Sequence, residues 1–475
     1  MKNVIVIGGG LAGLAAGVAL AESGWRVRLF EQRPFLGGRA TSYVLPSGEH
    51  VDNCQHVTLG CCTNLEDFYR RVGAAHKIKF FDRLVFIDAQ GRRGEMQAGL
   101  LPAPFHMTGA FASFAPLTLK DKLSIAWAML NILQTNGRTW DVNQFGGISM
   151  LDWLRRRHQT KGAIERFWRV VLVSALDEEL DKTDARYGID VFWKAFLSNR
   201  TGYRMGVPTV PLAELYDGCK SAIEEKGGEV NLRATARQLQ IENGAVTAAQ
   251  FDAGREERAD AFILAVPHTA VAALIPGEMR SASAFRNLAM LKTAPITGIH
   301  LWFDREVMTE PFVTLLDTTT QWIFNKTGLY GSVNGADKNS DKGQYLQLVV
   351  SASYSLLQTP RQEIIDMCLK EVRQALPAAR DANLIKATVT KEAAATFSPE
   401  PGVDRWRPKQ ETTVPNLFLA GDWTDTGWPA TMEGAVRSGY LAAEAVLRKE
   451  GRPHQFVRPD LAADGLVALW TRSQA

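Results

Sequence analysis

The first thirty residues show a regular succession of apolar and helical patterns. Val4–Ile7 is a run of four aliphatic residues and predicts a short buried strand. Leu11–Ser23 is rich in Ala and Leu and predicts a helix, and Gly24 lies where a helix commonly ends. Arg26–Phe30 alternates polar and apolar residues and predicts a second strand. The chain is therefore expected to open with a strand–helix–strand unit.

Later apolar patterns predict both helices and strands. Residues 119–197 are predicted to be helical, with a capping-box-like start at Thr118 and Asp121. Three runs alternate as expected for an antiparallel sheet covered on one face: Ile296–Phe303, Gln321–Asn325 and Tyr345–Ser351. Near the end of the chain, 417–420 predicts another buried strand, with a helix from about 430 to 448 after it.

Length and composition narrow the class of protein. The chain has 475 residues, which corresponds to about three domain-sized units. Hydrophobic residues make up 46% and charged residues 22%, so a large core is expected and global disorder is excluded. The net charge of +3 argues against an obligate nucleic-acid binder, which needs a concentrated basic face. The five Cys residues include no C-x-x-C pair, so neither a disulfide scaffold nor a metal site is predicted.

Neither a signal peptide nor a spanning helix is predicted. The apolar run Val4–Ile7 breaks at once into three glycines, unlike the apolar region of a signal peptide. The most apolar long stretch, Ala98–Leu119, is interrupted by Pro102, Pro104 and Pro116.

The junction between the first strand and the first helix has the chemistry of a dinucleotide site. It fits the pattern G-x-G-x-x-G with Gly8, Gly10 and Gly13. Without side chains there, a pyrophosphate can approach the backbone, and the helix start at Leu11 and Ala12 offers free N–H groups. Glu31, at the end of the second strand, can accept hydrogen bonds from a ribose diol.

A second motif follows this acidic residue. Gly37-Gly38-Arg39 with Ser42 resembles the second fingerprint of the flavin-dependent amine oxidase and phytoene desaturase superfamily. The resemblance implies that the cofactor is FAD rather than a nicotinamide. It also implies cofactor contacts at Gln32, Gly37, Gly38 and Arg39.

The far end of the chain matches the C-terminal flavin motif of the same superfamily. The resemblance assigns cofactor contacts to Gly421, Asp422, Pro429, Thr431 and Met432. Pro429 suits the first turn of the following helix, because its missing N–H would be unpaired there. The helix would direct its N-terminus at the flavin and stabilise the negative charge of the reduced form.

Two segments in the middle of the chain resemble further parts of the FAD domain. In 227–232, the backbone of Val230 would touch the adenine side. Ala259–Pro267 is similar to a strand that ends beside the cofactor. Either segment is also compatible with a plain strand and turn.

The two flavin motifs lie at opposite ends of the chain, so one nucleotide domain must be assembled from both. The predicted fold class is α/β: a Rossmann-like FAD-binding domain with an inserted α+β substrate domain and a helical region. We assign the FAD-binding domain to residues 1–75, 207–275 and 406–450. Residues 76–206 would form a mainly helical substrate- or membrane-facing region, and 276–405 the antiparallel-sheet substrate domain. A C-terminal tail, 451–475, is expected to be loosely ordered apart from an apolar stretch at 466–470.

The stretch Asp52-Asn53-Cys54-Gln55-His56 resembles the Asp-Asn-Gly-Gln-His signature of the squalene-associated FAD-dependent desaturases, now understood as hydroxysqualene dehydroxylases. Cys54 replaces the usual Gly, so backbone strain is expected if that position needs a positive φ. Such enzymes use reduced FAD to replace the hydroxyl of hydroxysqualene with hydrogen, giving squalene and water for hopanoid or sterol synthesis. The resemblance implies a hydrophobic C30 isoprenoid substrate, and the sequence does not identify the electron donor.

Asp52, Gln55 and His56 are the predicted catalytic residues. We expect Gln55 and His56 over the flavin, and His56 to supply or relay the proton that helps the hydroxyl leave. The alternative is that His56 is a buried structural hydrogen-bonding residue.

Because the implied substrate is insoluble in water, we expect the protein to act at a membrane surface. Ala98–Leu119, with Phe105, Met107, Phe111, Phe114 and Leu117, is either the interfacial patch or a buried core segment. The expected location is cytoplasmic, peripherally associated with the inner face of the cell membrane.

Two other functions fit the same motifs. A carotenoid desaturase shares the fold but oxidises its substrate, and the sequence does not show the direction of electron flow. A non-catalytic isoprenoid-binding protein, like the Rab dissociation inhibitors of the same architecture, would hold no flavin. The set Glu31, Arg39 and Asp422 argues against this second alternative.

Overall fold

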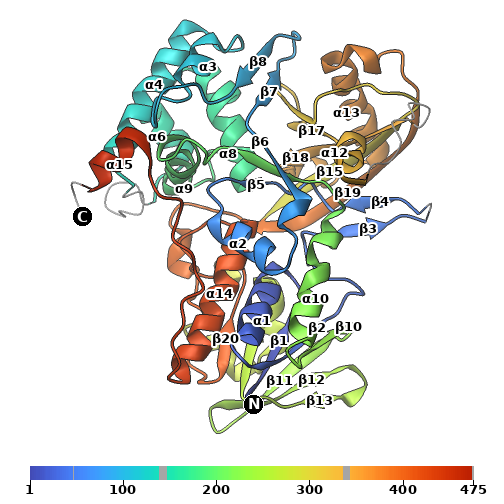
Figure 1. The fold of residues 1–475 in the computed structure, drawn as a ribbon, viewed down its shortest axis with the longest axis vertical. Coiled ribbons are helices and arrows are strands. Elements are labelled where there is room, and N and C mark those ends of the chain that lie inside the picture. Colours follow the sequence, from blue (N-terminus) through green and yellow to red (C-terminus); the bar gives the residue numbers. More distant parts are fainter. Residues whose placement is uncertain (47, 138–146, 335–342, 473–475) are drawn as a thin grey trace.

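The structure, a computed structural model, describes residues 1–46, 48–137, 147–334 and 343–472. Figure 1 shows a lower unit that holds the N-terminus, an upper helical region and, next to it, an upper sheet region. Blue, green and red segments meet in the lower unit, which is therefore built from both ends and the middle of the chain.

The lower unit is a parallel sheet with helices packed on it, as the opening pattern predicted. The five strands run in the order β10-β2-β1-β14-β20, and every neighbouring pair is parallel. Their bounds are β1 Asn3–Ile7, β2 Arg26–Glu31, β10 Glu229–Leu232, β14 Ala261–Leu264 and β20 Leu417–Leu419. The helices of this unit are α1 Leu11–Glu22, α2 Thr63–Arg71, α10 Asp217–Glu224, α11 His268–Leu274 and α14 Met432–Lys449. This is a Rossmann-like α/β unit.

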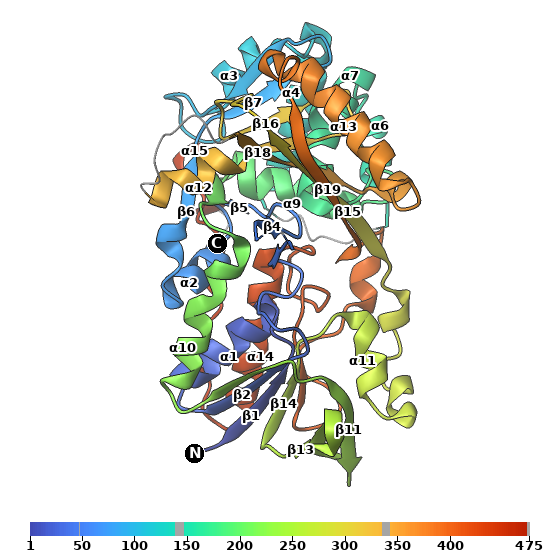
Figure 2. The ribbon, with the colours of Figure 1, turned by 90° about the vertical axis from the view of Figure 1, so that its right-hand side faces the viewer.

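The first and last helices of this unit pack very closely, which locks the two ends of the chain together. A Cβ at Gly439 of α14 would lie 2.2 Å from the Ala12 carbonyl oxygen of α1. Figure 2 shows α1 and α14 side by side behind the parallel strands.

Three small sheets accompany the two larger ones. They are β11 Ala236–Glu242, β12 Ala245–Phe251 and β13 Glu256–Glu257; β3 Ser42–Val44 and β4 His50–Asp52; and β5 Thr58–Leu59, β9 Met205–Pro208 and β6 Ile78–Phe81. The first of them, β11–β12–β13, lies at the base of the lower unit (Figure 1). The β3–β4 hairpin extends from the lower unit toward the sheet region (Figure 1).

The upper sheet has seven strands in the order β19-β15-β18-β17-β16-β7-β8. The bounds are β7 Leu84–Ile87, β8 Arg93–Met96, β15 Thr293–Phe303, β16 Phe312–Leu315, β17 Trp322–Asn325, β18 Gln344–Ser351 and β19 Leu384–Phe397. The three strands predicted here are present. Residues 76–206, predicted to be mainly helical, also contribute β7 and β8, which join this sheet through the parallel β7–β16 pair.

The two faces of this sheet have different neighbours. Ile323 and Leu348 pack in the core that α13 (Arg361–Ala375) also forms. The alternate residues Trp322 and Val349 point to the other face and line a cavity. The period-two pattern thus separates a face that packs in the core from a face that lines the cavity.

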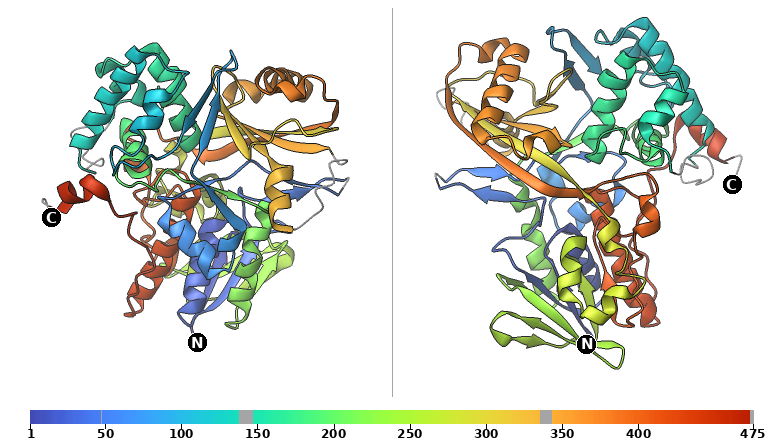
Figure 3. Two further views of the ribbon diagram at one scale, coloured as in Figure 1. Left: turned by 45° about the horizontal axis from the view of Figure 1, so that its top comes forward. Right: turned by 180° about the vertical axis from the view of Figure 1, so that it is seen from behind.

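The helical region lies beside this sheet (Figure 3), and its residues Ile125 and Val171 contribute to the cavity wall. Its helices are α3 Thr108–Ser113, α4 Leu119–Gln134, α6 Met150–Arg156, α7 Lys161–Ala163, α8 Arg169–Leu176 and α9 Ala185–Val191. The predicted capping box is confirmed, because Thr118 Oγ1 accepts from the Asp121 N–H and the Asp121 carboxylate accepts from the Thr118 N–H. Among the described residues, no helix combines the length and the apolar character that crossing a bilayer requires.

The C-terminal segment is held against the protein, so the expectation of a loosely ordered tail is wrong. The Phe456 N–H donates to Glu444 Oε1 at 2.7 Å, and the Arg458 guanidinium donates to Asp67 Oδ1 at 2.9 Å. The apolar stretch forms a helix, α15 Gly465–Arg472. The expectation failed because the partners of this segment lie far away in sequence.

Candidate flavin site and substrate cavity

The loop after β1 is shaped by close backbone contacts. Gly8 has a φ of 113°, and a Cβ there would lie 2.4 Å from the Ala265 carbonyl oxygen. A Cβ at Gly13 would lie 2.0 Å from the Gly8 carbonyl oxygen. At Gly10 a Cβ would meet only Gly38 Cα, at 3.8 Å. Gly10 therefore borders space that a pyrophosphate can enter.

The N-terminus of α1 adds a positive end to this space. No side chain caps the helix at Gly10, and its first turn contains no acidic residue. The first N–H groups, among them those of Leu11 and Ala12, thus meet no capping side chain. Such a helix end favours a phosphate group.

Glu31 holds the glycine loop from the end of β2. Its carboxylate accepts the Gly9 N–H at 2.7 Å and the Arg33 N–H at 2.8 Å. A carboxylate has about four acceptor positions, so ribose hydroxyls can bind as well. The neighbouring Gln32 is exposed.

Arg39 connects the two flavin motifs. Its guanidinium donates to Asp422 Oδ1 at 2.6 Å and to the Ala395 carbonyl at 2.6 Å. The Gly37 N–H donates to the Gly9 carbonyl at 2.8 Å, which places the paired glycines against the first loop. Gly37 and Gly38 both have positive φ, 101° and 61°, as a chain turning tightly past a ligand requires.

Arg407, which the sequence analysis missed, shapes the C-terminal motif. It is buried and donates to three carbonyl oxygens of one loop: Asp422 at 3.1 Å, Thr424 at 2.5 Å and Trp428 at 2.8 Å. Gly421 begins this loop, and its N–H donates to Ser438 Oγ of α14 at 2.8 Å. The Arg407 guanidinium thus holds the loop after β20 in place through three backbone carbonyl oxygens.

The start of α14 differs from the prediction. The helix begins at Met432, and its cap is Thr431, whose Oγ1 accepts the Gly434 N–H at 3.0 Å. Pro429 is therefore not in the first helical turn. Its carbonyl accepts the Thr431 N–H at 2.8 Å, so a tight turn precedes the helix and ends at the cap.

Val230 lies on β10, an edge strand of the parallel sheet, opposite Leu29 of β2. The contact of its backbone with adenine stays a prediction. Taken together, the open side of Gly10, the uncapped α1 and the Glu31 carboxylate fit the pyrophosphate and ribose of FAD.

A cavity of about 610 Å³ extends from the flavin motifs into the upper regions. Gln55, Thr431 and Met432 form part of its wall, and Phe105 and Leu130 form another part that is exposed at the surface. Most of the remaining wall is aliphatic or aromatic. Its size is that of a small-molecule site, and its lining suits a hydrocarbon.

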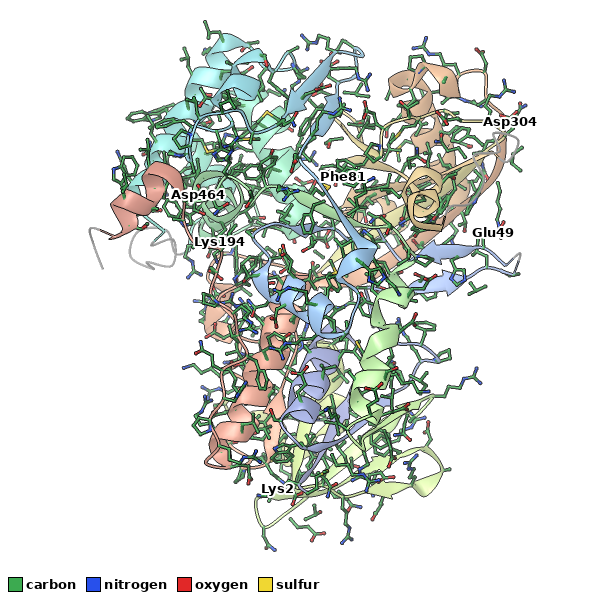
Figure 4. The ribbon with its side chains drawn as sticks, in the orientation of Figure 1. Lys2, Glu49, Phe81, Lys194, Asp304 and Asp464 are labelled. Carbon is green, nitrogen blue, oxygen red and sulfur yellow. The ribbon has the colours of Figure 1, made fainter. Side chains whose placement is uncertain are left out.

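A few polar groups interrupt this wall. Lys194 lines the cavity, where its Nζ lies 2.8 Å from Asp190 Oδ2 and 3.2 Å from Asp460 Oδ2. Figure 4 labels Lys194 where the helical region meets the lower unit. Asp460 belongs to the C-terminal segment, so that segment supports the cavity wall.

Asp52 is the centre of a buried polar network at the end of β4. Its Oδ1 accepts from Ser42 Oγ at 2.7 Å and from the Leu212 N–H at 3.1 Å. Its Oδ2 accepts from Lys326 Nζ at 2.7 Å and from the Tyr330 hydroxyl at 3.0 Å. Burial alone would raise the pKa of Asp52, but Lys326 and these donors hold it below the usual value. Asp52 is therefore ionised and inaccessible, which suits support of neighbouring groups.

The sequence analysis did not select Lys326. It follows β17 and is fully buried. The only signal in the sequence was a lone Lys directly after an apolar strand, a pattern that usually indicates a surface residue.

His56 is placed beside the network but does not line the cavity in the described part of the chain. Its Nδ1 lies 2.9 Å from the Cys54 carbonyl oxygen, so this nitrogen carries the proton. Burial lowers the pKa of His56, although the bond to Cys54 opposes this effect. This geometry fits the structural alternative, and the role in proton transfer stays a prediction.

Cys54 is not strained. The described non-glycine residues with positive φ do not include it, so a side chain is compatible with this backbone. Gly298 of β15 passes close by, and a Cβ there would lie 3.6 Å from Cys54 Sγ. The thiol thus occupies part of the space beside the β15–β19 pair.

Comparisons with known proteins agree with this site. Residues 11–447 match the family described as flavin containing amine oxidoreductase, so the chain belongs to that family and its cofactor is FAD. A probable zeta-carotene desaturase from Synechococcus elongatus is 28% identical over 94% of this chain and 99% of its own length. A zeta-carotene desaturase from a Synechocystis species is 27% identical over 95% and 98%.

A crystal structure of an oxidoreductase from Methanosarcina mazei superposes with a TM-score of 0.72. The alignment covers 94% of this chain and 100% of the other, with 19% identity. This similarity concerns the fold, whereas the two relatives named as zeta-carotene desaturases match nearly the whole chain in sequence.

Proposed function

We propose that this flavin oxidoreductase converts hydroxysqualene to squalene by reductive dehydroxylation. The observation that carries the proposal is the apolar cavity, which is lined by Thr431 and Met432 of the C-terminal flavin motif and by Gln55 of the Asp52–His56 stretch. The Asp52–His56 motif, which resembles that of the dehydroxylases, adjoins the same wall.

The reaction breaks the allylic C–O bond and forms a C–H bond. It consumes two electrons and two protons and releases water, so the protein needs an external reductant. Bound FAD, once reduced, supplies hydride. The residues of the chain bind the hydrocarbon, exclude water from the reacting carbon and hold the hydroxyl. This favours loss of that hydroxyl, once protonated, as water, which leaves a delocalised allylic cation to accept the hydride.

The polar groups in the cavity suit an alcohol better than a pure hydrocarbon. Gln55, Arg166 and Ser174 each contribute to the wall. Arg166 and Ser174 already have partners, Asp317 and the Val170 carbonyl. Gln55 Nε2 donates only one of its two N–H groups, to the His56 carbonyl, among the described residues. A buried polar group with an unused donor favours a substrate that can pair with it.

We also propose that the protein works on a membrane surface. Leu119, Leu123 and Trp127 follow one face of α4 and are 73%, 64% and 55% exposed. Leu100, Leu101 and Phe105 are exposed too, whereas Met107, Phe114 and Leu117 are buried. The exposed apolar face therefore lies mainly on α4 and 100–105 rather than along the whole stretch 98–119.

The exposed apolar face also reaches the cavity. Phe105 and Leu130 belong to both this face and the cavity wall, so a substrate dissolved in the lipid could enter the cavity between them.

The test is an anaerobic incubation of FAD-loaded protein, reduced with dithionite, with hydroxysqualene in vesicles. Squalene should form as the flavin reoxidises. The Ala175→Trp variant, which fills the cavity, should lose product while it keeps FAD. The exposed Ala272→Trp on α11 is the matched control and should remain active. Reducible flavin without squalene would contradict the proposal.

The second candidate is oxidative desaturation of a carotenoid, which the two whole-length relatives favour. It removes two hydrogens from adjacent carbons and passes two electrons to an acceptor. Oxidised protein that forms a conjugated product from a polyene, and no squalene from hydroxysqualene, would favour this reaction.

A further inference from the structure

Lys326 is an unusual residue in its position. It is the first residue of α12 (Lys326–Asn334), and its side chain is 0% exposed. A positive charge at a helix N-terminus opposes the helix dipole. Asn325 already caps this helix, because its Oδ1 accepts the Gly328 N–H at 2.9 Å. Lys326 is therefore not needed to begin the helix.

A buried Lys–Asp pair is poorly explained by stability alone. The desolvation of both charges offsets much of their attraction, and apolar residues of similar volume often stabilise such a site equally well. Burial lowers the pKa of Lys326 despite the attraction of Asp52. A role of the pair beyond stability is therefore expected.

Lys326 also bonds to a residue of the cavity wall. Its Nζ donates to Gln55 Oε1 at 2.8 Å. An ammonium group can only donate, so this contact fixes which end of the Gln55 amide carries oxygen. Gln55 Nε2 donates one N–H to the His56 carbonyl at 3.0 Å. The second N–H has no acceptor among the described residues, and Gln55 lines the cavity.

We propose that Lys326 is a positioning residue that orients the Gln55 amide so that its free N–H binds the hydroxyl oxygen of the substrate. Asp52 holds the ammonium group in place, and Lys326 in turn prevents the amide from rotating. The bond selects alcohols over hydrocarbons and supports the oxygen as it leaves. This inference rests on the proposed dehydroxylation, because a carotene offers no such oxygen.

The test compares binding of hydroxysqualene and squalene to oxidised, FAD-loaded protein, followed through the flavin absorbance in detergent micelles. The wild type should prefer the alcohol. Gln55→Leu removes the donor, and the double variant Asp52→Asn/Lys326→Met removes the anchor without leaving an unpaired buried charge. Both should lose about 3- to 10-fold of the preference, the size of one hydrogen bond. Thermal midpoint and FAD content report whether the variants are folded.

Tyr330→Phe is the matched control, because it removes one donor to Asp52 but no contact with Gln55. It should keep the preference. A double variant that retains the preference while Gln55→Leu loses it would overturn the role of Lys326. Wild-type protein that forms squalene without preferring the alcohol would overturn this inference alone, whereas failure to form squalene would overturn the proposed function as well.

Discussion

The Arg39 guanidinium donates a 2.6 Å hydrogen bond to Asp422 Oδ1, so the N-terminal and C-terminal flavin motifs are in direct contact. Asp422 is buried and Arg39 is partly exposed at the edge of the glycine loops. The pair therefore holds the two halves of the cofactor site at a fixed separation.

Asp422→Asn should weaken FAD binding because it removes the charge from this hydrogen bond. A hydrogen bond to a charged group contributes about 1.5–3 kcal/mol, so FAD affinity should fall roughly 10- to 100-fold. The ratio of FAD to protein after gel filtration measures this loss. Glu229→Gln, which alters an exposed ion pair with Arg26 on the same sheet, should keep its flavin.

Gly13→Ala should destabilise the protein and lower its FAD content. The added Cβ would lie 2.0 Å from the Gly8 carbonyl oxygen, so α1 or the loop has to move. We expect a loss of about 1–3 kcal/mol in the free energy of unfolding. The control is Gly109→Ala in α3, where a Cβ would meet nothing within 4 Å. Equal denaturation midpoints for both variants would contradict this reading of the loop.

Leu123→Ser/Trp127→Ser should reduce binding to lipid vesicles without affecting the fold. Each exposed side chain gains about 1.5–3 kcal/mol when fully buried in an apolar phase, so partitioning should fall at least about 10-fold. A flotation assay measures this change. Ile385→Ser removes a side chain of similar exposure from β19 and should bind vesicles like the wild type.

Asp177→Asn should become stabilising as the pH rises. Burial raises the pKa of Asp177 well above its usual value, although the Ala352 N–H and Thr396 Oγ1 bond its carboxylate. The protonated form therefore favours folding at low pH, and this contribution is lost as the pH rises through the raised pKa. Asn resembles the protonated acid, and it tolerates the φ of 54° at this position.

The thermal midpoint of both proteins from pH 4 to pH 8 checks this prediction. The variant should resemble the wild type in acid and exceed it at alkaline pH. A difference that stays constant over this range would show that ionisation of Asp177 does not limit stability.

Local patterns predicted the parts of the fold in which neighbouring residues determine the structure. The unit β1–α1–β2 was found because its periodicity and glycines act within one short segment. The capping box at Thr118 was found for the same reason. Pro429 was misplaced because Thr431, two residues later, is the stronger capping residue.

Contacts between residues that are far apart in the sequence could not be predicted from local sequence patterns. Lys326 pairs with Asp52, and Arg407 holds the loop after Asp422, only because the folded chain brings them together. The order of the C-terminal tail was not predicted for the same reason, because Arg458 donates to Asp67, a residue far away in the sequence. The flavin motifs were predicted, whereas the residues that support them were not.

The strand order of the lower unit also determines when, during synthesis, the nucleotide-binding domain can finish folding. β1 leaves the ribosome first, but β20 and α14 complete the same sheet and helix layer at the other end of the chain. The nascent chain thus cannot finish its nucleotide domain until β20 and α14 have been synthesised, although domains commonly fold as they emerge. Because both flavin motifs form the site, flavin meets a complete site only after α14 has been synthesised.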